Sequence, residues 1–250
     1  MKSVKEALLE RTSVRRYERE PIPEVTMQLI YDAVRNTPTS YNGQQFSVVD
    51  VTDQPTKEKL YALTGAKQIK TCNHFLVFLI DYHKMELIAK EKGIELPDFT
   101  DNADGVIVGT IDASLAMMNA ITMAESLGLG VCPVGFVRTA APAEVSMLLK
   151  LPQKTFVVSG LSIGVPREEP DLKPKQPREL LVFSNEYNND DASLTDYLKG
   201  YDAEIAHYNQ TREGTKSDND WAAHIVSYYR EAMNYRELQA LRSQGFDIKQ

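Results

Sequence analysis

Apolar side chains recur every three or four residues in several stretches of the chain, which is the spacing of a helix with one buried face. Ser3 followed by Glu6 has the spacing of a capping box and marks the first helix start. Pro23 precedes an apolar stripe and suits the first turn of a second helix. These patterns predict helices over about residues 3–11, 23–36, 55–63 and 142–149.

The longest apolar stretch, Gly105–Ala124, approaches the length that spans a lipid bilayer. It contains Asp112 and Asn119, and polar side chains are costly in lipid. We therefore interpret the stretch as a buried helix of a soluble protein, capped by Asp101 or Asp104 and ending near residue 127. Because it is apolar nearly all round, this helix needs partners on every side.

Short runs of β-branched and aromatic residues between these helices predict strands. The predicted strands are Phe46–Val51, Phe75–Ile80, Val131–Val137 and Phe156–Val165. Since strands and helices alternate, the fold class is α/β or α+β with a central sheet. From about Asp190 the pattern is helical again, with a break at Gly214 and few apolar residues. We expect this part to wrap over the main body or a partner subunit.

The length of the chain indicates how many domains it forms, and its net charge excludes some classes of function. A chain of 250 residues fits one large domain, and we expect a core over about residues 1–176 with a wrapping extension over 177–250. A net charge of −7 argues against a nucleic-acid binder, which would need a basic surface. The N-terminus is interrupted by charges and lacks the apolar run of a signal peptide, so we expect a cytoplasmic protein.

Two short motifs resemble a catalytic pattern and a metal-binding pattern, but the residues around them argue against both functions. Gly160–Gly164 matches the GxSxG nucleophile elbow of serine hydrolases, with His207 and His224 as candidate bases. An elbow must lead into a helix, whereas this motif leads into a charged, proline-rich segment, so strand glycines are the favoured interpretation. Cys72–His74 offers two metal ligands, but the two cysteines, 72 and 132, form no zinc pattern. A packed thiol and a hydrogen-bonded histidine are expected, with no metal site.

A basic cluster is the most informative feature. Arg11–Tyr17 reads RTSVRRY and follows the first helix, so a turn should present guanidinium groups and hydroxyls together. That combination suits a phosphate or a flavin carbonyl, while a solvated basic turn is the alternative. Lys173 and Lys175 form a second basic pair. In an acidic protein, an anion site requires local basic groups of this kind.

Four motifs occur together in one order. They are RTSVRRY with Pro21–Pro23, TPTSYNGQQF at Thr37–Phe46, AESLGLG at Ala124–Gly130 and PDLKPK at Pro170–Lys175. In this combination the whole chain resembles the FMN-dependent nitroreductase family, and most closely its larger, NADPH-preferring branch of oxygen-insensitive nitroreductases and flavin reductases. The resemblance implies an α+β fold, a three-layer α/β/α sandwich with a C-terminal helical extension. It also implies a homodimer formed around the long central helix, with two FMN sites at the interface.

The resemblance also implies which residues bind FMN. The phosphate would lie against Arg11, Thr12 and Ser13 together with Lys173 and Lys175, although relatives often have arginine in place of Lys175. Arg15 would lie beside the pyrimidine edge of the flavin, where a cation stabilises the anionic reduced ring. The remaining contacts are Thr39, Ser40, Tyr41, Asn42 and Gln44 from the other subunit, Lys67 and Gln68 beside the ribityl chain, and the backbone of Pro133, Val134, Gly135 and Phe136.

The implied activity is FMN-dependent NAD(P)H oxidation with ping-pong kinetics, in which the flavin supplies the chemistry and no catalytic side chain is needed. Nitroaromatics, quinones or flavins are the implied acceptors. Arg212 and Lys216 are candidates for the 2′-phosphate of NADPH or for solvated surface, and Ser217 stands where a second arginine is expected. The alternatives are a flavin reductase that supplies reduced FMN, a non-catalytic FMN-binding module, and the hydrolase. The physiological acceptor and the preference between NADPH and NADH stay open.

Overall fold

A computed structural model describes residues 1–249. It contains two compact units, one formed by Met1–Glu169 and the segment that begins at Arg236, the other by Pro170–Tyr235. The last helix, α11 (Glu237–Ser243), therefore groups with the first unit. The division expected near residue 176 stays a prediction.

The first unit is built on an antiparallel sheet in the order β1-β2-β4-β3. The strands are β1 (Phe46–Val51), β2 (His74–Asp81), β3 (Gly130–Val134) and β4 (Thr155–Gly164). Val48 of β1 pairs with Phe78 of β2, and Val77 of β2 pairs with Gly160 of β4. The central strands β2 and β4 are buried along almost their whole length.

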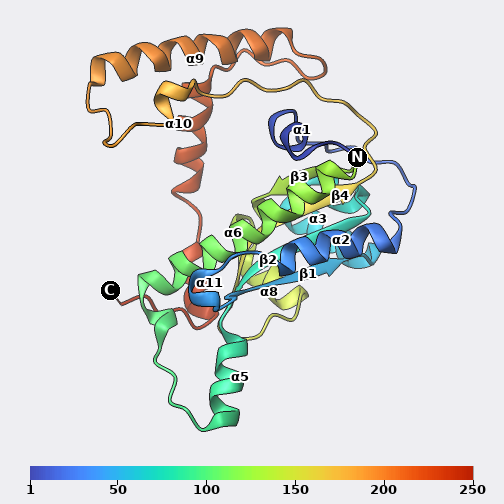
Figure 1. Cartoon of the computed structure of the whole chain (residues 1–250), viewed down its shortest axis with the longest axis vertical. Coiled ribbons are helices and arrows are strands. Elements are labelled where there is room, and N and C mark those ends of the chain that lie inside the picture. The colour runs from blue at the N-terminus through green and yellow to red at the C-terminus, as the bar shows by residue number, and fades with distance from the viewer. Residues whose placement is uncertain (250) are drawn as a thin grey trace. The chain divides into compact units, whose positions relative to one another are not determined.

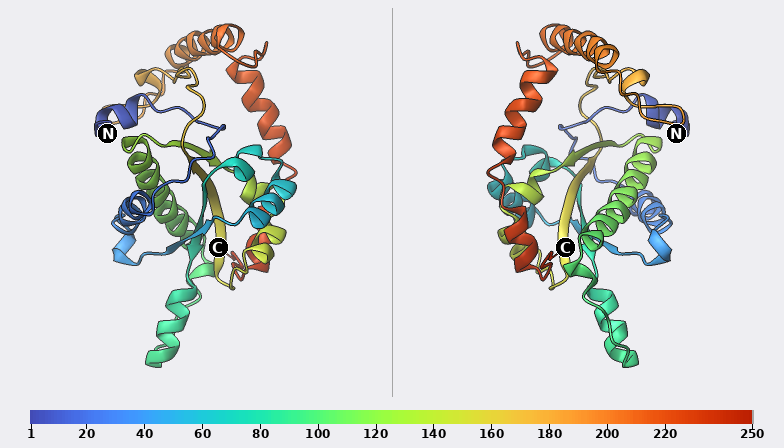
Figure 2. Two further views of the ribbon diagram at one scale, coloured as in Figure 1. Left: turned by 90° about the vertical axis from the view of Figure 1, so that its right-hand side faces the viewer. Right: turned by 90° about the vertical axis from the view of Figure 1, so that its left-hand side faces the viewer.

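Helices cover both faces of this sheet (Figures 1 and 2). In the first unit they are α1 (Val4–Leu9), α2 (Glu24–Arg35), α3 (Gln54–Thr64), α4 (Lys67–Thr71), α5 (His83–Lys92), α6 (Ala103–Ser126), α7 (Phe136–Thr139), α8 (Pro142–Leu148) and α11, with short 3₁₀ turns η1 (Ser40–Asn42) and η2 (Phe99–Asp101). Leu76, Phe78 and Ile80 of β2 pack with α2 and α6, whereas Phe75 and Val77 point to the opposite face. This alternation follows the period of two along a strand. The predicted three-layer α/β/α sandwich is confirmed.

The long helix α6 lies across one face of the sheet. Ala113, Ala116 and Ala120 are fully buried, because small side chains let the helix approach the strands closely. At 24 residues α6 is also long and apolar enough to cross a membrane by length and composition alone. Its cap is Asn102, whose side chain accepts from the N–H of Asp104, so the expected caps Asp101 and Asp104 were wrong. An amide caps a helix as well as a carboxylate does.

Two other boundaries differ from the sequence prediction. The strand predicted over Val131–Val137 ends at Val134, and the chain turns into α7 at Phe136. Val137 is fully buried in the second core cluster, and Arg138 donates to the Val158 carbonyl oxygen at 2.7 Å. These contacts favour the helical turn over a longer strand. The helices α4 and α5 were not predicted, because neither has a long apolar stripe.

The two weak motifs have the structural roles expected of them. Gly160–Gly164 lies inside β4, and Ser162 is fully buried, donating to the Cys132 carbonyl oxygen at 3.1 Å. Cys72 is a buried free thiol whose pKa is raised by burial to about 12. His74 lies 2.6 Å from Asp50 through Nδ1. Among the residues that the structure describes, no group of three or more metal-ligating side chains occurs.

The second unit contains two long helices and a 3₁₀ turn. These are α9 (Asp191–Thr211), α10 (Trp221–Ala232) and η3 (Arg178–Leu180). Tyr201 of α9 packs edge-on against Trp221 of α10, with ring centroids 5.6 Å apart. Asp190 and Asp220 cap the two helices through their side chains. Gly214 has φ +85° between them, which confirms the predicted break.

Candidate active site

The basic segment Arg11–Tyr17 lies along the edge of the sheet in extended form. The N–H of Val14 donates to the Val131 carbonyl oxygen of β3 at 3.0 Å, and Tyr17 forms an isolated bridge to Pro166. The expected turn is therefore wrong, because strand β3 at the edge of the sheet offers these unpaired groups as partners. Val14 and Tyr17 point inward, and Arg15 remains exposed.

Two glycines make room for this docking. A Cβ on Gly130 would lie 2.8 Å from the Val14 side chain, and one on Gly164 would lie 2.5 Å from the Tyr17 ring. The Tyr17 hydroxyl donates to the Val14 carbonyl oxygen at 2.6 Å and lies 2.8 Å from Ser162 Oγ. The segment is thus fixed at both ends, and the residues around Arg15 are held at a defined place beside β3.

Arg11 lies between a hydroxyl and a buried carboxylate. It donates to Ser13 Oγ at 3.3 Å, and its Nε lies 3.9 Å from Glu125 Oε1. Lys2 approaches the other oxygen of Glu125 at 3.8 Å. Burial raises the pKa of Glu125, and the cations Lys2 and Arg11 oppose this without reversing it. Arg11 Nε is buried on the Glu125 side and makes no hydrogen bond among the described residues, but the Arg11 side chain is 25% exposed, so other N–H groups of the guanidinium can reach an anion.

The raised pKa of Glu125 predicts a pH-dependent stability. The folded protein binds the Glu125 proton more tightly than the unfolded chain does, and the pKa of Glu125 in the unfolded chain is near 4.5. The stability that Glu125 contributes therefore falls as pH rises above that value. Glu125→Gln should remove this dependence. Measured from about pH 4 to 7, the free energy of unfolding of the wild type should fall relative to that of Glu125→Gln. Parallel curves across that range would contradict the assignment.

Glu168 fixes the backbone of the two neighbouring arginines. Its Oε1 accepts from the N–H of Arg15 at 2.7 Å and of Arg16 at 3.1 Å. Arg15 in turn donates through Nη1 to the Ser13 carbonyl oxygen at 3.2 Å. The sequence analysis missed Glu168, because a lone glutamate in a charged, irregular segment has no periodic signal. It missed Glu125 for a similar reason, since one acidic residue in a helix is ordinarily solvated.

A pocket of about 430 Å³ brings several predicted residues together. Arg15 and Arg16 line it with Lys67, Gln68 and Phe136. Gln68 Nε2 lies 4.0 Å from Cys132 Sγ, which connects α4 to β3. Burial raises the pKa of Cys132, and the positive charge of Arg15 opposes that rise. The pocket therefore combines cations, an amide and an aromatic ring beside the sheet edge.

The turn after β3 presents backbone to open space. Val134 is buried and belongs to the core, whereas Pro133, Gly135 and Phe136 are exposed. A Cβ built on Gly135 would meet nothing within 4 Å, and its φ of −70° suits any residue. Neither backbone geometry nor packing therefore requires glycine here. A flat group lying close against the backbone would give that requirement.

The predicted contacts Thr39, Ser40, Tyr41, Asn42 and Gln44 form a separate loop around η1. Tyr41, Asn42 and Gln44 are exposed, with left-handed φ of 53°, 55° and 52°. Among the residues that the structure describes, none of these five lines the 430 Å³ pocket. One chain thus carries the loop and the pocket as separate parts, and their meeting through a second subunit stays a prediction.

Within the second unit, Lys173 and Arg212 line a common pocket of about 220 Å³, with Ser217, Trp221 and His224 also in its wall. Arg212 donates through Nε to the Thr215 carbonyl oxygen at 2.8 Å. Lys175 donates to the Lys173 carbonyl oxygen at 3.0 Å. Lys216 is exposed, and it is not one of the described residues that line this 220 Å³ pocket. The structure thus groups Lys173 with Arg212.

Comparison with known proteins matches two family models to the chain. The model of the Nitroreductase family matches residues 8–165, and that of the Nitroreductase family, C-terminal domain, matches residues 173–249. The chain belongs to the nitroreductase family.

Similar proteins cover the chain almost completely. It is 34% identical over 251 residues to an FMN reductase [NAD(P)H] of Bacillus subtilis, covering 100% of both chains. It is 34% identical to an oxygen-insensitive NADPH nitroreductase of Salmonella typhimurium, covering 88% of each. The solved NADPH:FMN oxidoreductase of Vibrio harveyi, complexed with NAD⁺, has a TM-score of 0.84 and 26% identity, and 99% of each chain is covered.

Proposed function

We propose that this nitroreductase-family chain is an FMN-dependent NAD(P)H oxidoreductase. The observation that carries the proposal is the sheet edge beside β3. There the Arg11 guanidinium is partly exposed beside the Ser13 hydroxyl, and Gly135 faces open space. A cationic donor suits a phosphate, and the open glycine suits a planar ring. The names of the similar proteins support the same cofactor.

The residues present fit FMN part by part. Arg11, Thr12 and Ser13 bind the phosphate in this proposal, with Lys173 and Lys175 completing the site. Arg15 neutralises charge at the pyrimidine edge, while Lys67 and Gln68 contact the ribityl chain. Pro133–Phe136 offers backbone groups to the ring. When bound, FMN accepts electrons from NAD(P)H and passes them to an acceptor, so the protein contributes position, charge and exclusion of water.

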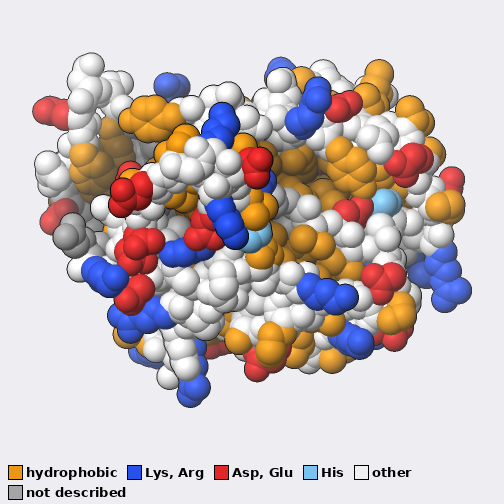
Figure 3. Space-filling model, turned by 90° about the horizontal axis from the view of Figure 1, so that it is seen from below, with side chains coloured by type: hydrophobic (Ala, Val, Ile, Leu, Met, Phe, Trp, Pro, Cys, Tyr) orange, Lys and Arg blue, Asp and Glu red, His pale blue; other side chains and the backbone are white. Residues whose placement is uncertain are grey.

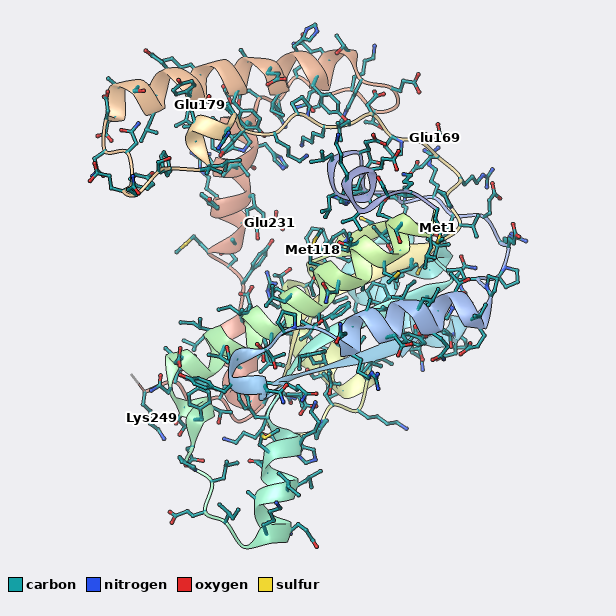
Figure 4. The ribbon with its side chains drawn as sticks, in the orientation of Figure 1. Met1, Met118, Glu169, Glu179, Glu231 and Lys249 are labelled. Atoms are coloured by element: carbon teal, nitrogen blue, oxygen red, sulfur yellow. The ribbon has the colours of Figure 1, made fainter. Side chains whose placement is uncertain are left out.

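A homodimer completes the site. Along α6, Ile107, Ile111, Leu115 and Met118 are between 39% and 54% exposed and share one face of the helix. Met118 is labelled on this helix in Figure 4. Such a continuous apolar stripe suits packing against the same helix of a second copy. The partner's η1 loop then supplies its predicted contacts to the flavin.

The proposal also covers the electron donor and the acceptor. Arg212, with Lys216 nearby in sequence, binds the 2′-phosphate of NADPH in this proposal, and a single arginine leaves NADH acceptable as well. Acceptors are nitroaromatics, quinones, flavins or an oxidised metal oxyanion. Their range agrees with the names of relatives, which include a Cr(VI) reductase of a Pseudomonas strain at 34% identity over 98% of this chain. Acidic and basic side chains are interspersed on the face shown in Figure 3, and that face carries no broad basic patch of the kind that nucleic acid requires. We place the enzyme in the cytoplasm, where NADPH is produced.

Ping-pong kinetics test this proposal. Donor and acceptor use one site in turn, so double-reciprocal plots at several fixed acceptor concentrations should be parallel. Menadione and a nitroaromatic such as nitrofurazone serve as acceptors. Lines that intersect would show that donor and acceptor bind together, and would contradict a single shared site.

Two rival functions are separated by simple observations. The hydrolase requires an accessible serine, whereas Ser162 is fully buried in β4 and hydrogen-bonded there. A non-catalytic FMN-binding module would hold the flavin without reacting with NAD(P)H. Flavin reductase and nitroreductase activities share one site and differ only in the acceptor used.

A further inference from the structure

A buried carboxylate on α6 holds both ends of the η1 loop. Asp112 is fully buried. Its Oδ1 accepts from the N–H of Ser40 at 3.1 Å, and its Oδ2 accepts from the N–H of Gln45 at 3.2 Å. A carboxylate has two acceptor oxygens, so one side chain satisfies two backbone donors five residues apart. Hydrogen bonds to a charged acceptor are stronger than neutral ones.

Between these two points the backbone is strained. Tyr41, Asn42 and Gln44 all have φ between 52° and 55°, a region that residues with a Cβ rarely adopt. Thr39 Oγ1 adds an acceptor for the N–H of Gln44 at 3.2 Å. The same three side chains are exposed, so burial of apolar surface does not stabilise this conformation. The loop needs its anchors to keep its shape.

Asn119, two turns further along α6, anchors the approach to the loop. Its Nδ2 donates to the Ala33 carbonyl oxygen at 3.1 Å and to Thr37 Oγ1 at 3.0 Å. Thr37 itself is buried at the end of α2. The polar residues that interrupt the apolar helix therefore both bind the chain between α2 and β1. Asp112 and Asn119 therefore hold this segment against α6 through hydrogen bonds.

We propose that Asp112 is a positioning residue for the cofactor site of the partner subunit, an inference that rests on the proposed function. Asp112 follows Ile111 in the sequence of α6, and Ile111 belongs to the exposed apolar stripe that forms the dimer interface in that proposal. Loop and interface are thus fixed to one helix, and pairing of the helices places Tyr41, Asn42 and Gln44 against the partner's flavin. Asp112 acts on FMN only through this loop.

The variant Asp112→Asn tests the proposal, since it keeps the side-chain volume but exchanges one acceptor oxygen for an NH₂ group. Loss of a charge-assisted bond should weaken FMN binding about tenfold. FMN affinity is measured by quenching of flavin fluorescence with FMN-free protein. Dimer mass, measured by light scattering, should stay unchanged. Asp104→Asn is the matched control, because Asp104 is exposed on the same helix, and it should bind FMN like the wild type.

Amide hydrogen exchange supplies a readout that does not depend on activity. In the FMN-free wild type the amides of Ser40 and Gln45 should exchange slowly, and addition of FMN should slow the loop further. In Asp112→Asn both amides should exchange faster while the amides of β2 stay protected. If the variant does not fold, the wild-type measurement decides: fast exchange at Ser40 and Gln45 would overturn the inference.

The outcomes separate this inference from the proposed function. A wild-type protein that does not bind FMN contradicts the proposed function. A wild type that binds FMN, together with an Asp112→Asn dimer that binds it equally well, contradicts only the positioning role. Weaker binding with an unchanged dimer and faster exchange at the two amides supports it.

Discussion

Replacing Leu115 with Asp should convert the dimer into monomers and release FMN. Leu115 lies in the middle of the exposed apolar stripe on α6, and in a two-fold pair the variant places two carboxylates in the interface. Burial of a charge without a partner costs several kcal/mol. Dissociation should therefore increase by roughly a thousandfold, which is about 4 kcal/mol. Light scattering and sedimentation of wild type and variant measure this change.

The loss of FMN should follow the loss of the dimer. In the proposal each flavin needs the partner's η1 loop, so a monomer retains only its own sheet-edge contacts. Met147→Asp is the matched control, because Met147 is 70% exposed on α8, which packs on the opposite face of the sheet from α6. A Leu115→Asp protein that stays dimeric and keeps its FMN would show that this stripe is not the interface.

Replacing Arg11 with Ala should weaken FMN binding by about 1.5–3 kcal/mol, the range for hydrogen bonds to charged groups. The Arg11 guanidinium is 25% exposed beside Ser13, and in the proposal its outer N–H groups donate to a phosphate oxygen. Equilibrium dialysis against FMN measures the loss, with Lys173→Ala giving an effect of similar size. Arg35→Ala removes the same charge from an exposed site that pairs only with Asp32 among described residues, and should leave the affinity unchanged.

Arg11 also lies beside the buried Glu125, so Arg11→Ala should lower stability as well as affinity. The double variant Arg11→Ala/Glu125→Gln separates these effects. A neutral amide at position 125 should restore much of the stability, because no unpaired buried charge remains. FMN affinity should stay low. If FMN binding recovers together with stability, the phosphate role of Arg11 is wrong.

The fold was predictable where patterns are periodic. The apolar stripe of α2, the long apolar run of α6 and the apolar runs of β2 and β4 carry strong signals, since burial alone decides them. The helix α6 ends at Ser126, close to the predicted end near residue 127, and Gly128 follows with φ +80°. The end of β3 was not predictable, because Val137 is equally apolar in a strand and in the helical turn that the core selects. The cap at Asn102 was missed because Asp101, Asn102 and Asp104, which lie within four residues, all have side chains that suit a cap.

Several residues of the pocket beside β3 come from the predicted motifs, whereas the residues that hold the predicted segments in place do not. Arg15, Lys67, Gln68 and Phe136 line one pocket, although they come from three distant segments. Glu168 and Asp112 hold the backbone around the predicted residues, yet neither belongs to a motif. Such supports depend on contacts between residues far apart in sequence, with separations of 153 and 72 positions. Local sequence patterns do not contain that information.

The visible spectrum of the purified protein, recorded before and after anaerobic addition of NADPH, tests the central claim most directly. NADH in a parallel sample reports the donor preference. The account predicts the absorption bands of oxidised flavin, which bleach with NADPH and return when menadione is added. A colourless protein that gains no flavin bands after incubation with FMN would contradict the account. Flavin bands that neither donor bleaches would leave a flavin-binding protein without the proposed activity.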